Sequence, residues 1–174
     1  MRRPANIAKL TLFLESLGKS ATGRGVVYLT GGATALLLGI RAETIDVDIK
    51  LDPEPVGVFD ANAKLKNDLD LNIELAAPDQ FIPELPGWRD RSQLISKTGT
   101  IEVRHYDFYS QALAKIERGH PNDLEDVRGY LKLGLIDLKK LKEFFDLIRA
   151  DLVRYPAINI AEYERRVVAF IASH

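Results

Sequence analysis

The chain contains no cysteine, a single methionine and a single tryptophan in 174 residues. Without cysteine there is no disulfide, no thiolate metal ligand and no thiol nucleophile, which fits a reducing compartment. No apolar run approaches the roughly 18 residues that a membrane-spanning helix needs, and the N-terminus lacks the apolar core of a secretion signal. We therefore expect a cytoplasmic protein that does not contact a membrane.

An excess of charge of one sign is also absent. The sequence has 24 basic and 25 acidic residues, a formal net charge of -1. This balance argues against a protein coated with basic residues for general nucleic-acid binding, although a local patch stays open. The length and the 46% hydrophobic content predict one domain with a real core and room for a small helical appendage.

Hydrophobic periodicity predicts alternating strands and helices first, and helices alone afterwards. The first helix is expected over 7–17, with Asn6 as its cap and Gly18 as its end. The proline-rich stretch 77–92 is expected to be an ordered loop. Strands are expected over 25–30, 44–51 and 69–76, with a hairpin over 94–108 that turns at Thr98 and Gly99; further helices are expected over 33–39, 59–69, 110–119, 122–134, 137–156 and 159–173.

Two carboxylates leave the polar face of the strand expected over 44–51. Asp46 and Asp48 alternate with Ile45, Val47 and Ile49, so the acids share one face and the apolar residues share the other. Their backbones are about 6.6 Å apart along the strand, which lets the side chains converge. Hard ions such as Mg²⁺ bind carboxylate oxygens, and two-metal sites hold their ions about 4 Å apart.

A third acid is expected from the next strand, over 69–76. Glu74 shares a polar face with Asp70 and Asn72, and that face could lie beside the first acidic strand. Glu74 is therefore the natural third metal carboxylate. The plain alternative is that both acidic faces are simply solvated.

Gly31 and Gly32 stand between the first strand and a short helix, with Thr34 close behind. Glycines allow backbone amides to approach an anion, and a helix N-terminus favours negative charge. The glycines would hold phosphates, Thr34 would add a hydroxyl, and the acids would hold the metal. The alternative is an ordinary tight turn.

The combined pattern GGATALLLGIRAETIDVDIKL resembles the DNA polymerase beta-like nucleotidyltransferase superfamily. Within that superfamily it looks like the minimal nucleotidyltransferase domains related to the AbiEii toxins of type IV toxin-antitoxin systems, which carry a double glycine, a nearby Thr or Ser, and a T-x-D-x-D strand. The stretch IELAAPDQFIPELPGW is also similar to small proteins of this group, and the resemblance extends to about residue 135.

The resemblance implies Mg²⁺-dependent transfer of a nucleotidyl group from an NTP. Asp46, Asp48 and Glu74 would be the metal carboxylates, with one or two ions, and the glycine turn would meet the nucleotide phosphates. The acceptor would be a hydroxyl of tRNA, of another RNA or of a protein, and a toxin would have an antitoxin as partner. The implied fold is α+β: a nucleotidyltransferase-like mixed sheet flanked by helices over 1–110, and a helical region over 111–174 packed on it.

A later motif of those toxins falls on Lys115, Asp123 and Asp126. The lysine could contact phosphate as a point charge, and the two acids would support catalysis. Asn122 stands where the toxins have a basic residue. The alternative is structural, because Asn122 and Glu125 have the spacing of a capping box and acids stabilise a first helical turn.

Other polar and aromatic residues give weaker signals. The histidines show no metal-ligand spacing, so His105 is expected to pack in the sheet, and His120 to lie in a turn. Trp88 is either a lid or a cover for the edge of the core. Four basic residues could line a path for RNA phosphates or could simply be solvated: Arg89, Arg91, Lys97 and Arg104.

Two rival functions follow from the same sequence. The first is a catalytically silent module that keeps the fold and a nucleotide or partner site. The second is a structural protein that oligomerises through the apolar helix residues Phe144, Phe145, Leu147 and Ile148. Packing of these residues on the chain's own core is the alternative explanation.

Overall fold

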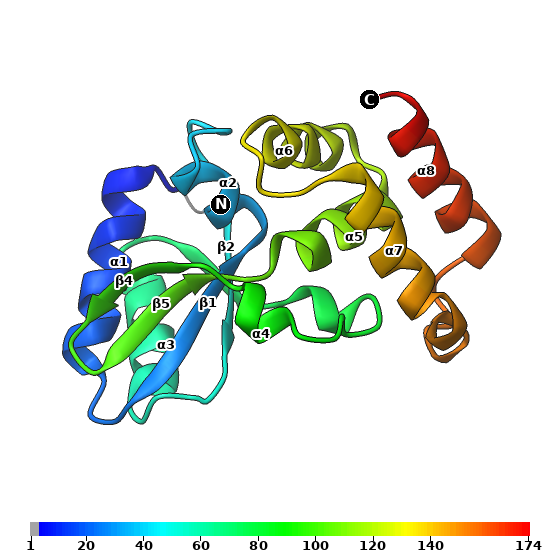
Figure 1. Cartoon of the computed structure of the whole chain (residues 1–174). Coiled ribbons are helices and arrows are strands. Elements are labelled where there is room, and N and C mark those ends of the chain that lie inside the picture. The colour runs from blue at the N-terminus through cyan, green and yellow to red at the C-terminus, as the bar shows by residue number, and fades with distance from the viewer. Residues whose placement is uncertain (1–3) are drawn as a thin grey trace. The chain divides into compact units, whose positions relative to one another are not determined.

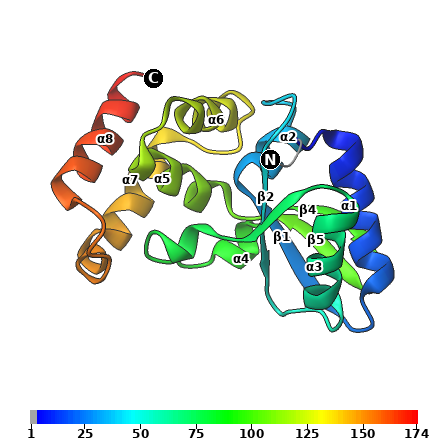
Figure 2. The same ribbon diagram turned by 180° about the vertical axis from the view of Figure 1, so that it is seen from behind.

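The computed structural model describes residues 4–174, and they divide into two compact units. The first unit comprises the described residues up to Ala77 together with Ser92–Tyr106, and the second comprises Pro78–Arg91 together with Asp107–His174. The segment 78–91 lies within the range predicted for the α/β core, but it belongs to the helical unit. Figures 1 and 2 show the chain from two opposite sides.

One mixed sheet forms the centre of the first unit, in the strand order β3-β2-β1-β5-β4 (Figure 1). Strand β1 is antiparallel to β2 and parallel to β5, β2 is parallel to β3, and β4 is antiparallel to β5. This mixed sheet with flanking helices confirms the predicted α+β class. The strands are β1 (Gly25–Thr30), β2 (Asp46–Leu51), β3 (Asn72–Leu75), β4 (Leu94–Thr98) and β5 (Ile101–His105).

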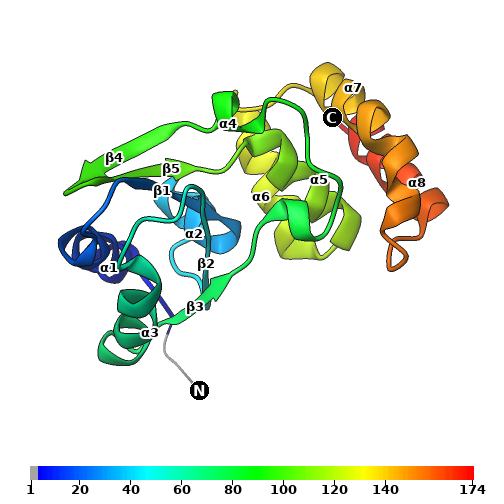
Figure 3. The same ribbon diagram turned by 90° about the horizontal axis from the view of Figure 1, so that it is seen from below.

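The helices of the first unit are α1 (Ile7–Ser20), α2 (Gly31–Leu37) and α3 (Val58–Asp68). Helices α1 and α3 lie side by side on one face of the sheet (Figure 3). The predicted cap is confirmed, because Asn6 Oδ1 accepts a hydrogen bond from Lys9 N–H at 3.0 Å. The core alternates along the strands as expected; its members include Leu10, Phe13, Leu17, Val27, Leu29, Val47, Ile49, Ile73, Ile101 and Val103. Each such buried side chain contributes about 1.5–3 kcal/mol.

Gly18 does not end the first helix, which continues to Ser20. A Cβ on Gly18 would lie 2.2 Å from Thr98 Cγ2 and 2.7 Å from the Thr98 carbonyl oxygen. The glycine is needed because the hairpin packs directly on the helix backbone. The prediction was wrong because a close approach across the fold leaves the same mark in the sequence as a helix end.

The acidic strands are shorter than their alternation suggested. Ile45 is 64% exposed and precedes β2, while Thr44 pairs with Ala5 in an isolated bridge. Leu75, at the end of β3, is 44% exposed. The alternation therefore fails at Ile45 and at Leu75, while Val47, Ile49, Leu71 and Ile73 are buried in the core.

Helices make up the second unit: η1 (Pro78–Gln80), α4 (Trp88–Arg91), α5 (Phe108–Arg118), α6 (Pro121–Lys132), α7 (Leu138–Ile148), η2 (Arg149–Arg154) and α8 (Ile160–Ala172). The single helix expected over 137–156 is interrupted, since the 3₁₀ segment η2 replaces its second half. Helix α5 packs against α6, α7 and α8. No helix within 4–174 is long and apolar enough to cross a bilayer.

The apolar residues considered for oligomerisation mostly pack within their own unit. Phe145 and Ile148 are buried, and the Phe145 ring meets Tyr163 edge-on at 5.0 Å. Phe144 contacts the Tyr109 ring at 4.9 Å. Only Leu147, at 61% exposed, faces solvent. Internal packing therefore explains this sequence pattern.

Candidate active site

The parallel pairing of β2 with β3 brings the predicted acids to one face of the sheet. Asp48 lies in register with Glu74, and Asp46 lies in register with Asn72. Paired residues on neighbouring strands project from the same face, with backbones about 4.8 Å apart. Asp46 and Asp48 are half-buried and Glu74 is exposed, so the three carboxylates run from the sheet's interior towards its edge.

Asn72 links two of these acids. Its Nδ2 donates to Asp46 Oδ1 at 2.6 Å and to Glu74 Oε1 at 3.0 Å. A carboxylate can only accept, so the amide must turn its NH₂ group towards both. These donations offset the repulsion between the two anions. The sequence placed Asn72 on the polar face but gave no sign of this bridge, which depends on the register of β3.

The double glycine lies directly against the acidic strand. Gly31 has a φ of +58°, and a Cβ on it would lie 2.2 Å from Asp48 Oδ2. A Cβ on Gly32 would lie 2.0 Å from Thr44 Oγ1. The glycines are therefore needed to admit the side chains of Asp48 and Thr44 beside the turn. The sequence predicted instead that the glycines allow an anion to approach the backbone. That phosphate contact stays a prediction.

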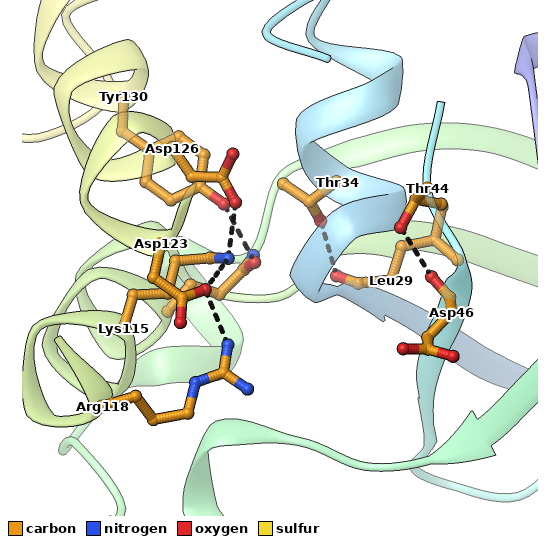
Figure 4. Close-up of polar contacts among 10 residues, drawn as sticks. Leu29, Thr34, Thr44, Asp46, Lys115, Arg118, Asp123, Asp126 and Tyr130 are labelled. Atoms are coloured by element: carbon orange, nitrogen blue, oxygen red, sulfur yellow. Dashed lines mark hydrogen bonds and ion pairs between the residues drawn. The ribbon is translucent and has the colours of Figure 1, made fainter. Parts of the chain in front are cut away.

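Thr44 fixes the start of the acidic strand. Its Oγ1 donates to the backbone carbonyl of Asp46 at 3.0 Å, as Figure 4 shows. Thr44 is 6% exposed, whereas Asp46 is half-buried, so the bond lies at the boundary between the core and the polar face. In the sequence, only the T-x-D-x-D pattern marked this residue.

Thr34 lies on α2, three residues after Gly31, and is fully buried. The Thr34 hydroxyl donates to the carbonyl oxygen of Leu29 at 3.0 Å (Figure 4), and His105 Nδ1 lies 3.2 Å from Thr34 Oγ1. Because Thr34 uses its only hydrogen for Leu29, the neutral His105 ring donates from Nδ1 to Thr34 Oγ1. His105 packs in the sheet, as expected, and burial lowers its pKa to about 4. The predicted contact of Thr34 with phosphate stays a prediction.

The set of side chains offers hard oxygen ligands of the kind that Mg²⁺ prefers. Within residues 4–174, however, no three acidic or histidine side chains stand close enough together to hold an ion. Asp46 and Glu74 are instead joined through the amide of Asn72. The ligand types therefore fit the metal, and the side chains would have to close around it.

A scan against protein-family models matches residues 5–171 to a family described as "Nucleotidyltransferase of unknown function (DUF6036)". The chain belongs to this nucleotidyltransferase family. The activity class is thus transfer of a nucleotidyl group, and the substrate class is a nucleotide. Comparisons with curated proteins and with solved structures gave no match. The finer likeness to AbiEii toxins stays a prediction.

In the second unit of this nucleotidyltransferase, the later motif forms a buried ionic cluster (Figure 4). Lys115 Nζ lies 2.6 Å from Asp126 Oδ2 and 3.2 Å from Asp123 Oδ1, and Arg118 reaches Asp123 at 2.8 Å. Lys115, Asp123 and Asp126 are at most 5% exposed. Two cations thus compensate two anions and tie α5 to α6. The geometry brings the three predicted residues together, and their catalytic role stays a prediction.

The proposed capping box on α6 was wrong. The helix begins at Pro121, and His120 is its cap without a side-chain bond, so Asn122 is already inside the helix. Proline fits the first helical position because its fixed φ suits the helix and it has no N–H to leave unpaired. Asp123 does lie in the first turn, where an acid is favourable.

Most of the remaining residues considered in the sequence have structural roles. Trp88 is buried at 1% exposed, which favours the core-cover interpretation. Arg91 donates twice to Asp107, the cap of α5, at 3.0 and 2.9 Å. Arg104 and Lys97 both pair with Glu102, and hydrogen bonds from Arg104 and then Lys97 lower the pKa of that carboxyl. Arg91, Lys97 and Arg104 are thus engaged with acids of their own unit.

Proposed function

We propose that this protein is a Mg²⁺-dependent enzyme that transfers an NMP from an NTP to a hydroxyl group of an RNA, such as tRNA, or of a protein. The family match supports the reaction class. The observation that carries the rest is the register that sets Asp48 beside Glu74, with Gly31 against the Asp48 carboxylate. Oxygen ligands of the kind that bind catalytic metal ions therefore lie beside a backbone segment that a phosphate can approach closely.

Asp46, Asp48 and Glu74 would hold Mg²⁺, which supplies neutralisation of the phosphate charge when bound. The bend at Gly31 and Gly32 would admit the phosphates beside Asp48. One carboxylate accepts the proton of the acceptor hydroxyl. The acceptor oxygen then bonds to the α-phosphorus, the bond to the bridging oxygen breaks, and pyrophosphate leaves with that electron pair. Positioning and electrostatics supply most of the rate.

By the resemblance stated above, Lys115, Asp123 and Asp126 would also support this reaction. Lys115 is a point charge suited to phosphate. Its bonds to both acids hold the ammonium group at a fixed place on α5. By the same proposal, the protein is a toxin of a type IV system, with an antitoxin protein as its partner.

The experiment is a label-transfer assay with each of the four NTPs, on total RNA and on total protein, with and without Mg²⁺. Asp48→Asn should abolish transfer, since it removes one anionic ligand while keeping the shape of the side chain. Glu43→Gln is the matched control, because Glu43 is an exposed acid just ahead of the strand. Circular dichroism of both variants checks the fold. Undiminished transfer by Asp48→Asn would overturn the proposal.

The alternative is a catalytically silent module that binds a nucleotide. It is favoured by the absence, within 4–174, of any three acids already placed to hold an ion. Such a protein would bind NTP without transferring label to any acceptor. Binding that survives Asp48→Asn, together with no transfer by the parent chain, would select this alternative.

A further inference from the structure

A pocket of about 240 Å³ lies between α5, α6 and α8 in the second unit. Its apolar wall is formed by Ile116, Leu124 and Phe170. Its charged side chains are two arginines, Arg128 and Arg166, and no acidic residue lines it. A concave apolar wall with convergent charge of one sign is the usual composition of a small-molecule site.

The two arginines keep hydrogen-bond donors in reserve. Arg128 uses Nη1 for Glu125, at 2.5 Å. Arg166 uses Nε for Glu162, at 3.1 Å, and Nη1 for the backbone carbonyl of Glu117. Within residues 4–174, Nη2 of each guanidinium makes no hydrogen bond or ion pair. Both groups can therefore donate to an anion without breaking their present bonds.

Gly119 helps to hold Arg166 in this place. It ends α5 with a φ of +69°, and a Cβ on it would lie 3.2 Å from Arg166 Cζ. The bare backbone lets the guanidinium rest on the end of α5, where it reaches Glu117. Arg166 is thus anchored by the helix end and by Glu162, which lowers the entropy lost when it binds a ligand.

We propose that this pocket binds a small organic anion that has an apolar body about the size of one ring. The anionic group pairs with Arg128 and Arg166, and the apolar body covers Ile116, Leu124 and Phe170. A carboxylate and a phosphate monoester share this chemistry, and the guanidinium fork suits both. None of the residues that line the pocket is among those proposed for nucleotidyl transfer, so it would be a second ligand site.

The test is a titration of the full chain, followed by NMR, with phenyl phosphate, benzoate and the uncharged benzamide. We expect at least one of the two anions to bind with a Kd on the order of 1 mM, as fits a ligand of this size. Benzamide should bind at least about tenfold more weakly, because it lacks the charge-assisted bonds. Comparison of the two anions tells which group the site prefers.

Arg128→Gln should weaken binding of the preferred anion about tenfold. Arg165→Gln is its control, because Arg165 is an exposed neighbour that also pairs with Glu162 but does not line the pocket. Ala169→Trp should block the pocket, whereas Val168→Trp, one residue earlier on the same helix and 50% exposed, should not. The proposal fails if neither anion binds at 10-fold the expected Kd, or if Ala169→Trp leaves binding unchanged.

Discussion

Asn72 acts on its neighbours through two short donations. The amide bridges Asp46 and Glu74, so it holds together two groups that would otherwise repel. In metal enzymes, residues that orient the ligands commonly affect metal affinity or activity by about 10- to 100-fold. Asn72 is in this sense a positioning residue for the proposed chemistry.

Asn72→Ala should therefore reduce label transfer by about 10- to 100-fold and raise the Mg²⁺ concentration needed for half-maximal rate. The reason is that Asp46 and Glu74 lose their shared donor. The measurement is transfer rate against Mg²⁺ concentration. Gln93→Ala, an exposed amide outside the strands, is the control. An unchanged Mg²⁺ dependence would show that the bridge has no part in the reaction.

His105 makes stability depend on pH. Burial lowers its pKa from 6.5 to about 4. Between pH 6.5 and pH 4, His105 is therefore protonated in the unfolded chain and neutral in the folded chain. The folded state therefore loses stability as the pH falls from 6.5 to 4, by at most about 1.4 kcal/mol per pH unit. Urea unfolding at pH 7.5, 6.5, 5.5 and 4.5 measures this. His105→Asn should lose most of the slope, and an equal slope in the variant would refute the assignment.

Individual residues were predictable where the local pattern decided their role. The cap at Asn6 and the common face of Asp46 and Asp48 follow from spacing alone. The bridge by Asn72 and the burial of Thr34 were not predictable, because both depend on which strand or ring lies opposite. A short sequence window does not contain that partner.

Among the elements, α1 and the β4–β5 hairpin pack backbone against backbone. Gly18 and Gly99 face each other there, and a Cβ on Gly99 would lie 2.5 Å from the Gly18 carbonyl oxygen. Gly18 is inside a helix, where alanine would by itself be better by up to about 1 kcal/mol. Steric exclusion outweighs that preference here.

Gly18→Ala should accordingly destabilise the protein by about 1–2 kcal/mol, since overpacking costs about 1–3 kcal/mol and improved helix propensity returns part of it. Thermal unfolding of the variant measures the net effect. Gly39→Ala offers a contrast: it has open space around it, and only its positive φ opposes the change. Stabilisation by Gly18→Ala would mean that the hairpin can move away from the helix.

At this scale the sequence predicted the kinds of elements well and their ends less well. Helix and strand periodicities located the sheet and the later helices. The change from α-helix to 3₁₀ geometry at Arg149 was missed because no residue type in RADLVR interrupts the helical pattern.

For the whole molecule, the division into units does not follow the order of the chain. The segment 78–91 joins the helical unit, where Arg91 pairs with the buried Asp107 and lies over the Phe144 ring at 4.3 Å. Periodicity could not reveal this, since the segment has none. The partners of this segment, Asp107 among them, are far from it in sequence and are identified only from the three-dimensional structure.

A fragment ending at Tyr106 should therefore leave the segment 78–91 without its own unit. Trp88 is the sole tryptophan, so its fluorescence reports on this segment alone. We expect the emission maximum of the fragment to shift to longer wavelength, towards that of the urea-unfolded chain, because Trp88 becomes exposed to solvent. Emission equal to that of the full chain would contradict the assignment of this segment to the helical unit.

The packing of the β4–β5 turn on Gly18 also guides how the protein should be handled at the bench. Hairpin tips are the customary places for an inserted epitope or fluorophore, yet here an insert after Gly99 would push against the α1 backbone. Gly39 and Gly134 end helical segments and have no heavy atom within 4 Å of an added Cβ. Tags for imaging or surface tethering belong at those two turns.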